Sequence, residues 1–161
     1  MFNHLGMFLS CAATLEADAA AGYDELAATM TERGDTEVAA MFTQFARFSR
    51  LHHEEIERLR DAELGPNAPA PDPIVWPDEF SPENPLAVAQ LEGMTPRRAI
   101  ETALETERRA CDFYSAVAEQ SRHARIQELA QEFAEEEAEH AAHLERWLER
   151  YDTGSNSNQA S

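Results

Sequence analysis

Glutamate and histidine side chains stand at regular spacings in several segments of this chain. Glu137 and His140 form a Glu-x-x-His motif, which places a carboxylate and an imidazole on one face of a helix, one turn apart. Glu16 and Glu107 lie in two further segments. One glutamate from each of two helices together with Glu-x-x-His is the ligand pattern of bundles that bind two metal ions. The pattern predicts a site in which carboxylates bridge two cations about 3.5–4 Å apart and each imidazole binds one of them.

Two tyrosines keep a fixed distance from the first two glutamates. Tyr23 follows Glu16 by seven positions, and Tyr114 follows Glu107 by seven. The first pair precedes the second by 91 positions (16 to 107 and 23 to 114). We expect the phenols to donate hydrogen bonds that orient the carboxylates. The alternative is that both are core aromatic residues, whose hydroxyl groups would still need a partner.

A second offset relates the two remaining segments. Phe45 and His52 precede Phe133 and His140 by 88 positions (45 to 133 and 52 to 140). The two halves of the chain are therefore related hairpins, and each contributes half of one site. In every segment an otherwise apolar face has Glu or His at its middle. Because burial of an ionised carboxylate costs several kcal/mol, these groups must neutralise one another or share a cation.

Four stretches with helical periodicity would position these groups. Gly34 suits a left-handed end to the first helix, and Asp35 suits the N-cap of the second. Thr95 followed by Pro96 marks the start of the third. The predicted helices cover residues 8–33, residues 36–61, the residues from 95 onward, and residues 124–151.

The segment 65–94 separates the second and third helices and contains most of the prolines. A connection of this length lets the third helix run parallel to the second, whereas the other two connections are short. We expect Trp76, Phe80 and Leu86 to hold it against the helices, and residues 85–92 to form a short helix. The predicted fold is all-α, a ferritin-like four-helix bundle with a long crossover between helices 2 and 3.

Length, charge and cysteine content narrow the class of protein. The 161 residues suit one domain, with the bundle over 1–151 and a disordered polar tail over 152–161. A net charge of −18 argues against binding to nucleic acid or anionic membranes. No apolar run is long enough to span a bilayer. Cys11 and Cys111 form no CxxC pair, and no Lys or Arg precedes Arg33, so a signal peptide is not indicated and we expect a cytoplasmic protein.

Together these features resemble the rubrerythrin branch of the ferritin-like superfamily. The resemblance covers most of residues 8–150 outside the crossover, and four segments carry it: 16–23, 45–59, 105–114 and 133–145. It implies a non-haem di-iron centre that reduces hydrogen peroxide, or dioxygen, with electrons from a partner. Full-length rubrerythrins carry a rubredoxin module with two CxxC pairs, which this sequence lacks. The resemblance therefore implies a separate electron donor, such as a rubredoxin-type protein or a reductase.

The family's ligand pattern can be carried over residue by residue. It assigns the metal ligands to Glu16, His52, Glu107, Glu137 and His140, and roles in catalysis to Glu16, Glu107, Glu137, Tyr23 and Tyr114. Ser49 stands 88 positions before Glu137, where the family would place another bridging glutamate. Three carboxylates leave one charge of two ferrous ions unbalanced, so we expect weaker metal binding on the Ser49 side. Glu55, one turn beyond His52, is a candidate replacement, although a position at the solvent edge suits it better.

Three classes of function agree with this ligand set. The first is an oxidoreductase that turns over peroxide or dioxygen at two iron ions. The second is an iron-binding or ferroxidase-type protein that handles metal without a further substrate. The third is a ferritin-like scaffold whose centre has partly decayed, beginning at Ser49. The ligands would also accept one iron ion, manganese or zinc. A bundle of this kind is expected to form a homodimer.

Overall fold

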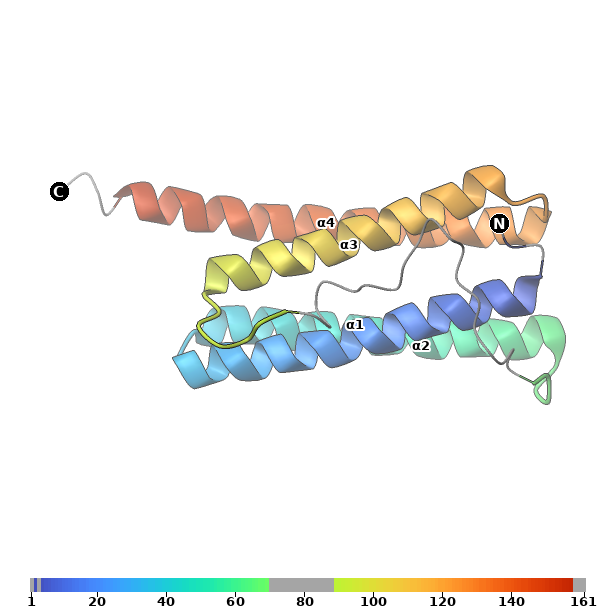
Figure 1. Cartoon of the computed structure of the whole chain (residues 1–161), viewed down its shortest axis with the longest axis horizontal. Coiled ribbons are helices and arrows are strands. Elements are labelled where there is room, and N and C mark those ends of the chain that lie inside the picture. Colours follow the sequence, from blue (N-terminus) through green and yellow to red (C-terminus); the bar gives the residue numbers. More distant parts are fainter. Residues whose placement is uncertain (1, 3, 70–88, 158–161) are drawn as a thin grey trace.

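The computed structural model describes Phe2 and residues 4–69 and 89–157, and these contain four α-helices (Figure 1). Each helix covers an expected stretch, although the ends differ. α2 runs three residues past the expected position 61, and α4 continues six residues past the expected end at 151, into the polar segment. The helices are α1 (Leu5–Arg33), α2 (Thr36–Leu64), α3 (Pro96–Gln120) and α4 (Ala124–Ser157).

The ends of the helices follow local sequence signals. Gly34 has φ 86°, in the left-handed region that glycine tolerates, and its N–H bonds to the carbonyls of Met30 and Thr31. The Thr95 hydroxyl accepts a hydrogen bond from the backbone of Arg98 at 3.2 Å, which confirms the predicted start of α3. Asp35 occupies the N-cap position of α2 but makes no side-chain cap there. Its carboxylate instead accepts from Arg33 Nε at 3.2 Å, so the capping prediction was wrong.

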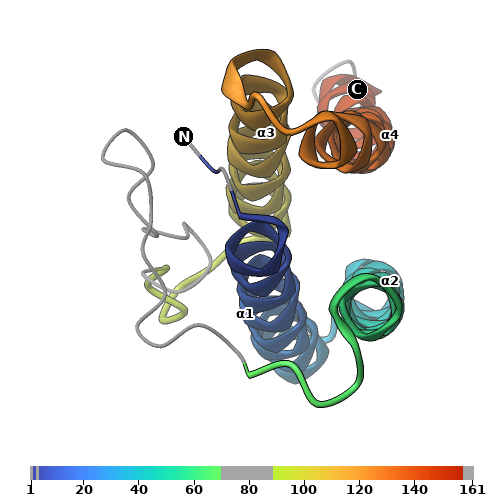
Figure 2. The same cartoon turned by 90° about the vertical axis from the view of Figure 1, so that its right-hand side faces the viewer.

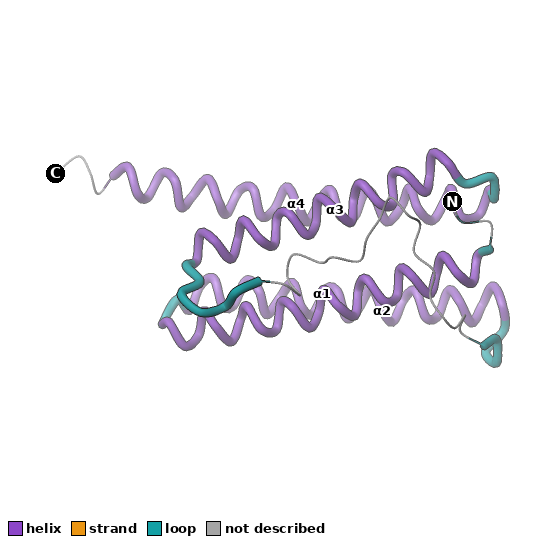
Figure 3. Tube along the Cα trace, in the orientation of Figure 1, coloured by secondary structure: helices purple, strands orange, loops and turns teal. Residues whose placement is uncertain are grey.

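The order and direction of the helices give the predicted ferritin-like topology. α1 and α2 run antiparallel, as do α3 and α4, while α2 and α3 run in the same direction (Figure 1). The connections within each pair are short, whereas α2 ends at Leu64 and α3 begins only at Pro96 (Figure 3). Trp76, Phe80 and Leu86 lie outside the described residues. Of the helix expected over 85–92, the described part, residues 89–92, is not helical.

Seen along the bundle, the two antiparallel pairs form the two layers, with α3 next to α1 and α4 on the side of α2 (Figure 2). Contacts are dense within each pair and sparser between the pairs. Two apolar clusters fill the interior. One includes Leu26, Phe42 and Leu104, and the other includes Phe8 and Leu129. The polar residues predicted to bind metal lie between these clusters along the helices.

The helices can also be compared with membrane-spanning segments. In the described parts of the chain, none has a stretch that is both long and apolar enough to cross a bilayer.

Candidate metal centre

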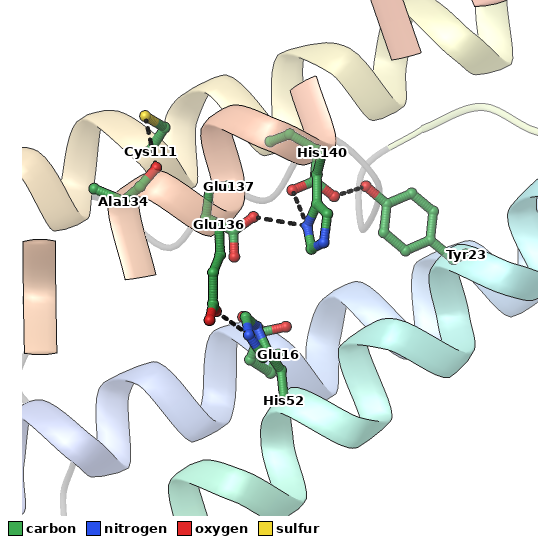
Figure 4. A network of polar contacts seen from close by, with 9 residues as sticks. Glu16, Tyr23, His52, Cys111, Ala134, Glu136, Glu137 and His140 are labelled. Carbon is green, nitrogen blue, oxygen red and sulfur yellow. Dashed lines mark hydrogen bonds and ion pairs between the residues drawn. The ribbon is translucent and has the colours of Figure 1, made fainter. Parts of the chain in front are cut away.

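Polar side chains from all four helices meet in the middle of the bundle (Figure 4). Glu16 extends from α1, His52 from α2, Glu107 from α3, and both Glu137 and His140 from α4. The three glutamates are only 4–6% exposed, although their helices are otherwise packed through apolar side chains. The structure thus brings together all five residues that the sequence proposed as ligands.

One group of possible ligands is formed by α3 and α4. Oxygen and nitrogen atoms of Glu107, Glu137 and His140 all lie within 4.8 Å of one another. The Nδ1 atom of His140 is 3.5 Å from Glu107 Oε2 and 3.6 Å from Glu137 Oε2. The Glu-x-x-His spacing therefore directs one imidazole nitrogen towards two carboxylates, as a metal ion between them would require.

The other group adds α1 and α2. Ligand atoms of Glu16, His52 and Glu137 also lie within 4.8 Å of one another. His52 Nδ1 is 3.3 Å from Glu16 Oε1, and the rings of His52 and His140 have centroids 6.1 Å apart. Because Glu137 belongs to both groups, its carboxylate is placed to bridge two metal ions, with one imidazole at each.

The buried carboxylates strongly influence one another. Burial, together with the charge of Glu107, raises the pKa of Glu137 well above its usual value of 4.5. Burial also tends to raise the pKa of Glu107, but hydrogen bonds to Glu137 and His140 outweigh it and lower that pKa. Without a cation, one carboxyl group therefore retains a proton that its neighbour's charge holds in place. A bound cation would balance the carboxylate charges, so both carboxyl groups could then ionise.

The surrounding carboxylates favour the charged form of both histidines. Burial tends to lower the pKa of His52, but hydrogen bonds to Glu136 and Glu16 outweigh it and raise the pKa to about 10. Burial also opposes charge on His140, yet the hydrogen bond and the charge of Glu107 raise its pKa above 6.5. Positive charge on the imidazole rings therefore balances part of the carboxylate charge that metal ions would otherwise balance.

The two tyrosines differ despite their matched spacing. Tyr23 and Tyr114 are both fully buried. Tyr23 donates a hydrogen bond to Glu107 Oε1 on the other helix pair (Figure 4). The hydroxyl group of Tyr114 has no hydrogen-bond partner among the described residues. The structure places Tyr23 where we expected a donor that orients a carboxylate, whereas Tyr114 makes no such contact.

Comparisons with known proteins agree with this geometry. The rubrerythrin family model matches residues 98–161. The crystal structure of an uncharacterized conserved protein from Magnetospirillum magnetotacticum MS-1 is similar, with 32% sequence identity and a TM-score of 0.74. The match covers 91% of this chain and 95% of that one. The chain belongs to the rubrerythrin family. A search of curated proteins found no match.

The residues present suit the metal pair that the rubrerythrin family implies. Three nearly buried carboxylates and two imidazoles converge, and such hard oxygen and nitrogen donors suit iron or manganese. The partnerless hydroxyl of Tyr114 is a further polar group left buried at this level of the bundle. Burial and then the charge of Glu16 raise its pKa, which shows that this carboxylate acts on it. An apolar core would not be expected to bury so many polar groups together, whereas a metal site requires them.

Ser49 marks the place where this rubrerythrin-family chain departs from the pattern. Its side chain is 5% exposed and faces inward, as the offset of 88 from Glu137 predicted. Glu55 is exposed and belongs to neither ligand group among the described residues, as expected for a residue at the solvent edge. The described residues therefore offer three buried carboxylates at the centre, from Glu16, Glu107 and Glu137.

A groove between α2 and α4 leads to the centre. It has a volume of about 410 Å³, and both His52 and His140 line it. Phe48 and Leu51 form part of its apolar lining and are 37% and 47% exposed. The sequence analysis did not predict this opening, because periodicity shows which residues face inward but not how closely two helices approach.

Sequence reasoning also missed Glu136. This residue stands in the run Glu135-Glu136-Glu137, of which the sequence pattern assigned a role to Glu137 alone. In the structure its carboxylate contacts Nε2 of His52 across the groove (Figure 4). The repeat offset of 88 could have pointed to it, because position 136 corresponds to Phe48, which lines the same groove from the matching helix.

Proposed function

We propose that this chain is a non-haem di-iron oxidoreductase that reduces hydrogen peroxide, or dioxygen, with electrons from a separate donor. The observation that carries the proposal is the pair of ligand groups that share Glu137, each with one imidazole and one further carboxylate. Iron bound there would supply the electrons for the reaction. Reduction of one peroxide molecule to two water molecules consumes two electrons, which two ferrous ions could supply, and two protons, which would come from solvent through the groove described above.

The protein side chains have separate tasks in this proposal. Glu137 would be shared between the two metal positions, while Glu16 and Glu107 would each hold the metal on one side. Tyr23 fixes the orientation of Glu107 through its hydrogen bond. Apolar clusters on both sides keep water away from the buried carboxylates, except where the groove opens.

The groove supports a small oxidant as substrate. It connects solvent with the two histidines, so a molecule of the size of peroxide could reach the centre without movement of a helix. Its wall combines the imidazoles with Phe45 and Phe48, and it includes the charged residue Arg146. This route delivers the substrate between the helix pairs, next to the position where Glu137 would bridge.

The electrons have to come from outside these 161 residues. A rubredoxin centre needs four cysteine thiolates, whereas the sequence contains two cysteines. Cys111 donates to the backbone carbonyl of Ala134 at 3.4 Å, and neither cysteine belongs to a ligand group among the described residues. A rubredoxin-type protein or a reductase would therefore act as the partner.

The test begins with metal content. The chain is loaded anaerobically with ferrous iron, excess metal is removed, and iron per chain is counted. Peroxide is then added to the reduced protein together with a chemical reductant, and its consumption is followed. About two iron ions per chain and repeated turnover would support the proposal, and the Glu137→Gln variant should lose both.

Two other results would each redirect the assignment. Oxidation of ferrous iron with retention of the ferric product, and no turnover of peroxide, would indicate a metal-handling protein. Iron content near zero would overturn the proposal and leave a ferritin-like scaffold. Ser49 gives the metal-handling outcome its physical basis, because loss of one carboxylate changes how tightly two ions are held.

A further inference from the structure

We propose that Glu136 is a positioning residue of the centre, which binds the outer nitrogen of His52 and supplies the negative charge that Ser49 does not provide. The inference rests on the proposed di-metal function and adds a residue to its site. Glu136 lies on α4, directly before the shared ligand Glu137. Its carboxylate reaches across the groove to α2, where His52 and Ser49 stand.

The two nitrogens of His52 face different carboxylates. Nδ1 lies 3.3 Å from Glu16, a member of the ligand group, and Nε2 contacts Oε2 of Glu136. A histidine that binds metal through one nitrogen commonly donates the other N–H to a carboxylate, which fixes the ring and makes it a stronger ligand. Glu136 occupies that outer place. Its Oε2 is buried at the contact, although the side chain as a whole is 42% exposed.

The other histidine has a different outer environment. The ring of His140 stacks on Phe48 with an interplanar angle of 6° and a centroid distance of 6.1 Å. Phe45 contacts the same ring edge-on at 5.7 Å. The repeat offset of 88 makes Phe48 the counterpart of Glu136 (48 to 136). Each of these two equivalent positions therefore contacts the histidine of the other hairpin. Phe48 contacts His140 with an aromatic ring, and Glu136 contacts His52 with a carboxylate.

A count of charges explains why the Glu136 carboxylate lies beside His52, on the Ser49 side of the centre. Glu16, Glu107 and Glu137 carry three negative charges, whereas two divalent ions carry four positive charges. The buried Ser49 adds none. Glu136 brings the total to four, and the imidazole of His52 transmits its effect to the metal. α2 thus has serine at position 49, where the family pattern has a carboxylate, and α4 provides a carboxylate at position 136 that reaches across the groove to His52.

Glu136 acts through His52 in this arrangement and does not bind metal directly. The two nitrogens of an imidazole ring point away from each other, so a carboxylate bound to Nε2 lies on the far side of the ring from a metal at Nδ1. Glu136 also belongs to neither of the two ligand groups found among the described residues. The contact with Glu136 therefore orients the His52 ring and makes it a stronger metal ligand.

The test measures metal binding without turnover. Manganese(II) is titrated into the full chain, and free and bound ions are distinguished by their electron paramagnetic resonance signals. We expect Glu136→Gln to weaken binding of one of two ions by roughly tenfold to a hundredfold and to change the spectrum of the bound pair. Glu139→Gln is the matched control, because Glu139 lines the same groove and its substitution removes the same charge.

Two further variants separate charge from orientation. The glutamine side chain at position 136 can still accept a hydrogen bond from Nε2, so Glu136→Ala should weaken binding more than Glu136→Gln. Adding Ser49→Glu to Glu136→Gln should restore the affinity, because a carboxylate returns to the position that lacks one. Circular dichroism of each variant checks that the helices are intact.

The outcomes distinguish this inference from the proposed function. If the unmodified chain binds two ions and Glu136→Gln binds them equally well, the role of Glu136 is refuted while the di-metal function stands. Equal weakening by Glu136→Gln and Glu139→Gln would also refute it, since any nearby charge would then suffice. If the unmodified chain binds no metal, both proposals fail together.

Discussion

Metal binding at this centre should release protons, and the structure indicates where they come from. In the metal-free chain, burial tends to lower the pKa of His52, but hydrogen bonds to Glu136 and Glu16 raise it to about 10. The imidazole is therefore protonated at pH 7, and a metal ion can bind only when that proton leaves. His52 alone should release close to one proton per chain, because its pKa lies about three units above that pH.

His140 and Glu137 should add to the number of protons released. Burial tends to lower the pKa of His140, but the hydrogen bond and the charge of Glu107 outweigh it and raise that pKa, so His140 should add to the protons released. Burial and the charge of Glu107 raise the pKa of Glu137. The total at pH 7 should therefore exceed one proton and reach at most about three. It should fall as the pH rises, and His52 should be among the last groups to contribute.

Calorimetry can measure this number directly. Manganese(II) is titrated into metal-free protein at pH 7 in several buffers that differ in their enthalpy of ionisation, and the slope of the observed enthalpy against the buffer enthalpy gives the protons released. Manganese avoids oxidation during the titration. His53→Ala should leave the slope unchanged, because His53 belongs to neither ligand group. Binding with a slope near zero would refute the reasoning, since the imidazoles would then have been neutral or would not be ligands.

Three further changes test other parts of the structure. Glu137→Gln should remove metal from both positions, whereas Glu107→Gln should leave about one ion per chain, as metal analysis will show. Tyr23→Phe should weaken metal binding by roughly tenfold because it removes the donor to Glu107, whereas Tyr114→Phe should have little effect; titration of both variants compares them. Leu129→Ala, at a site 1% exposed, should lower the free energy of unfolding in urea by about 2–5 kcal/mol without changing the metal content.

The four helices were predictable because their signals are local. Apolar periodicity, the left-handed Gly34 and the capping Thr95 all act over a few residues, and the structure shows each of them. The length of the crossover then allowed α2 and α3 to be parallel, as they are in the structure (Figure 1). The end of α4 was less predictable, because the polar residues after Tyr151 give neither a strong helix signal nor a strong stop signal.

The centre was partly predictable for a different reason. The offsets of 91 and 88 compare one half of the chain with the other, so they identify residues that occupy equivalent places, such as Glu16 and Glu107. They cannot show how far a long side chain extends. The offsets therefore could not predict the groove or the contact of Glu136 with His52, because both depend on the distance between α2 and α4.

Comparison of equivalent positions in the two hairpins shows that the two halves of the site differ. Two related hairpins would by default give two equal half-sites, yet three equivalent pairs differ. Tyr23 donates a hydrogen bond to a carboxylate while Tyr114 does not, and Ser49 is the counterpart of Glu137, the residue proposed to bridge the ions. Glu136 contacts one histidine where an aromatic ring contacts the other. If two ions bind, they therefore have unequal surroundings, and we expect the ion beside His52, whose charge balance depends on the partly exposed Glu136, to exchange first and to respond first to changes in salt.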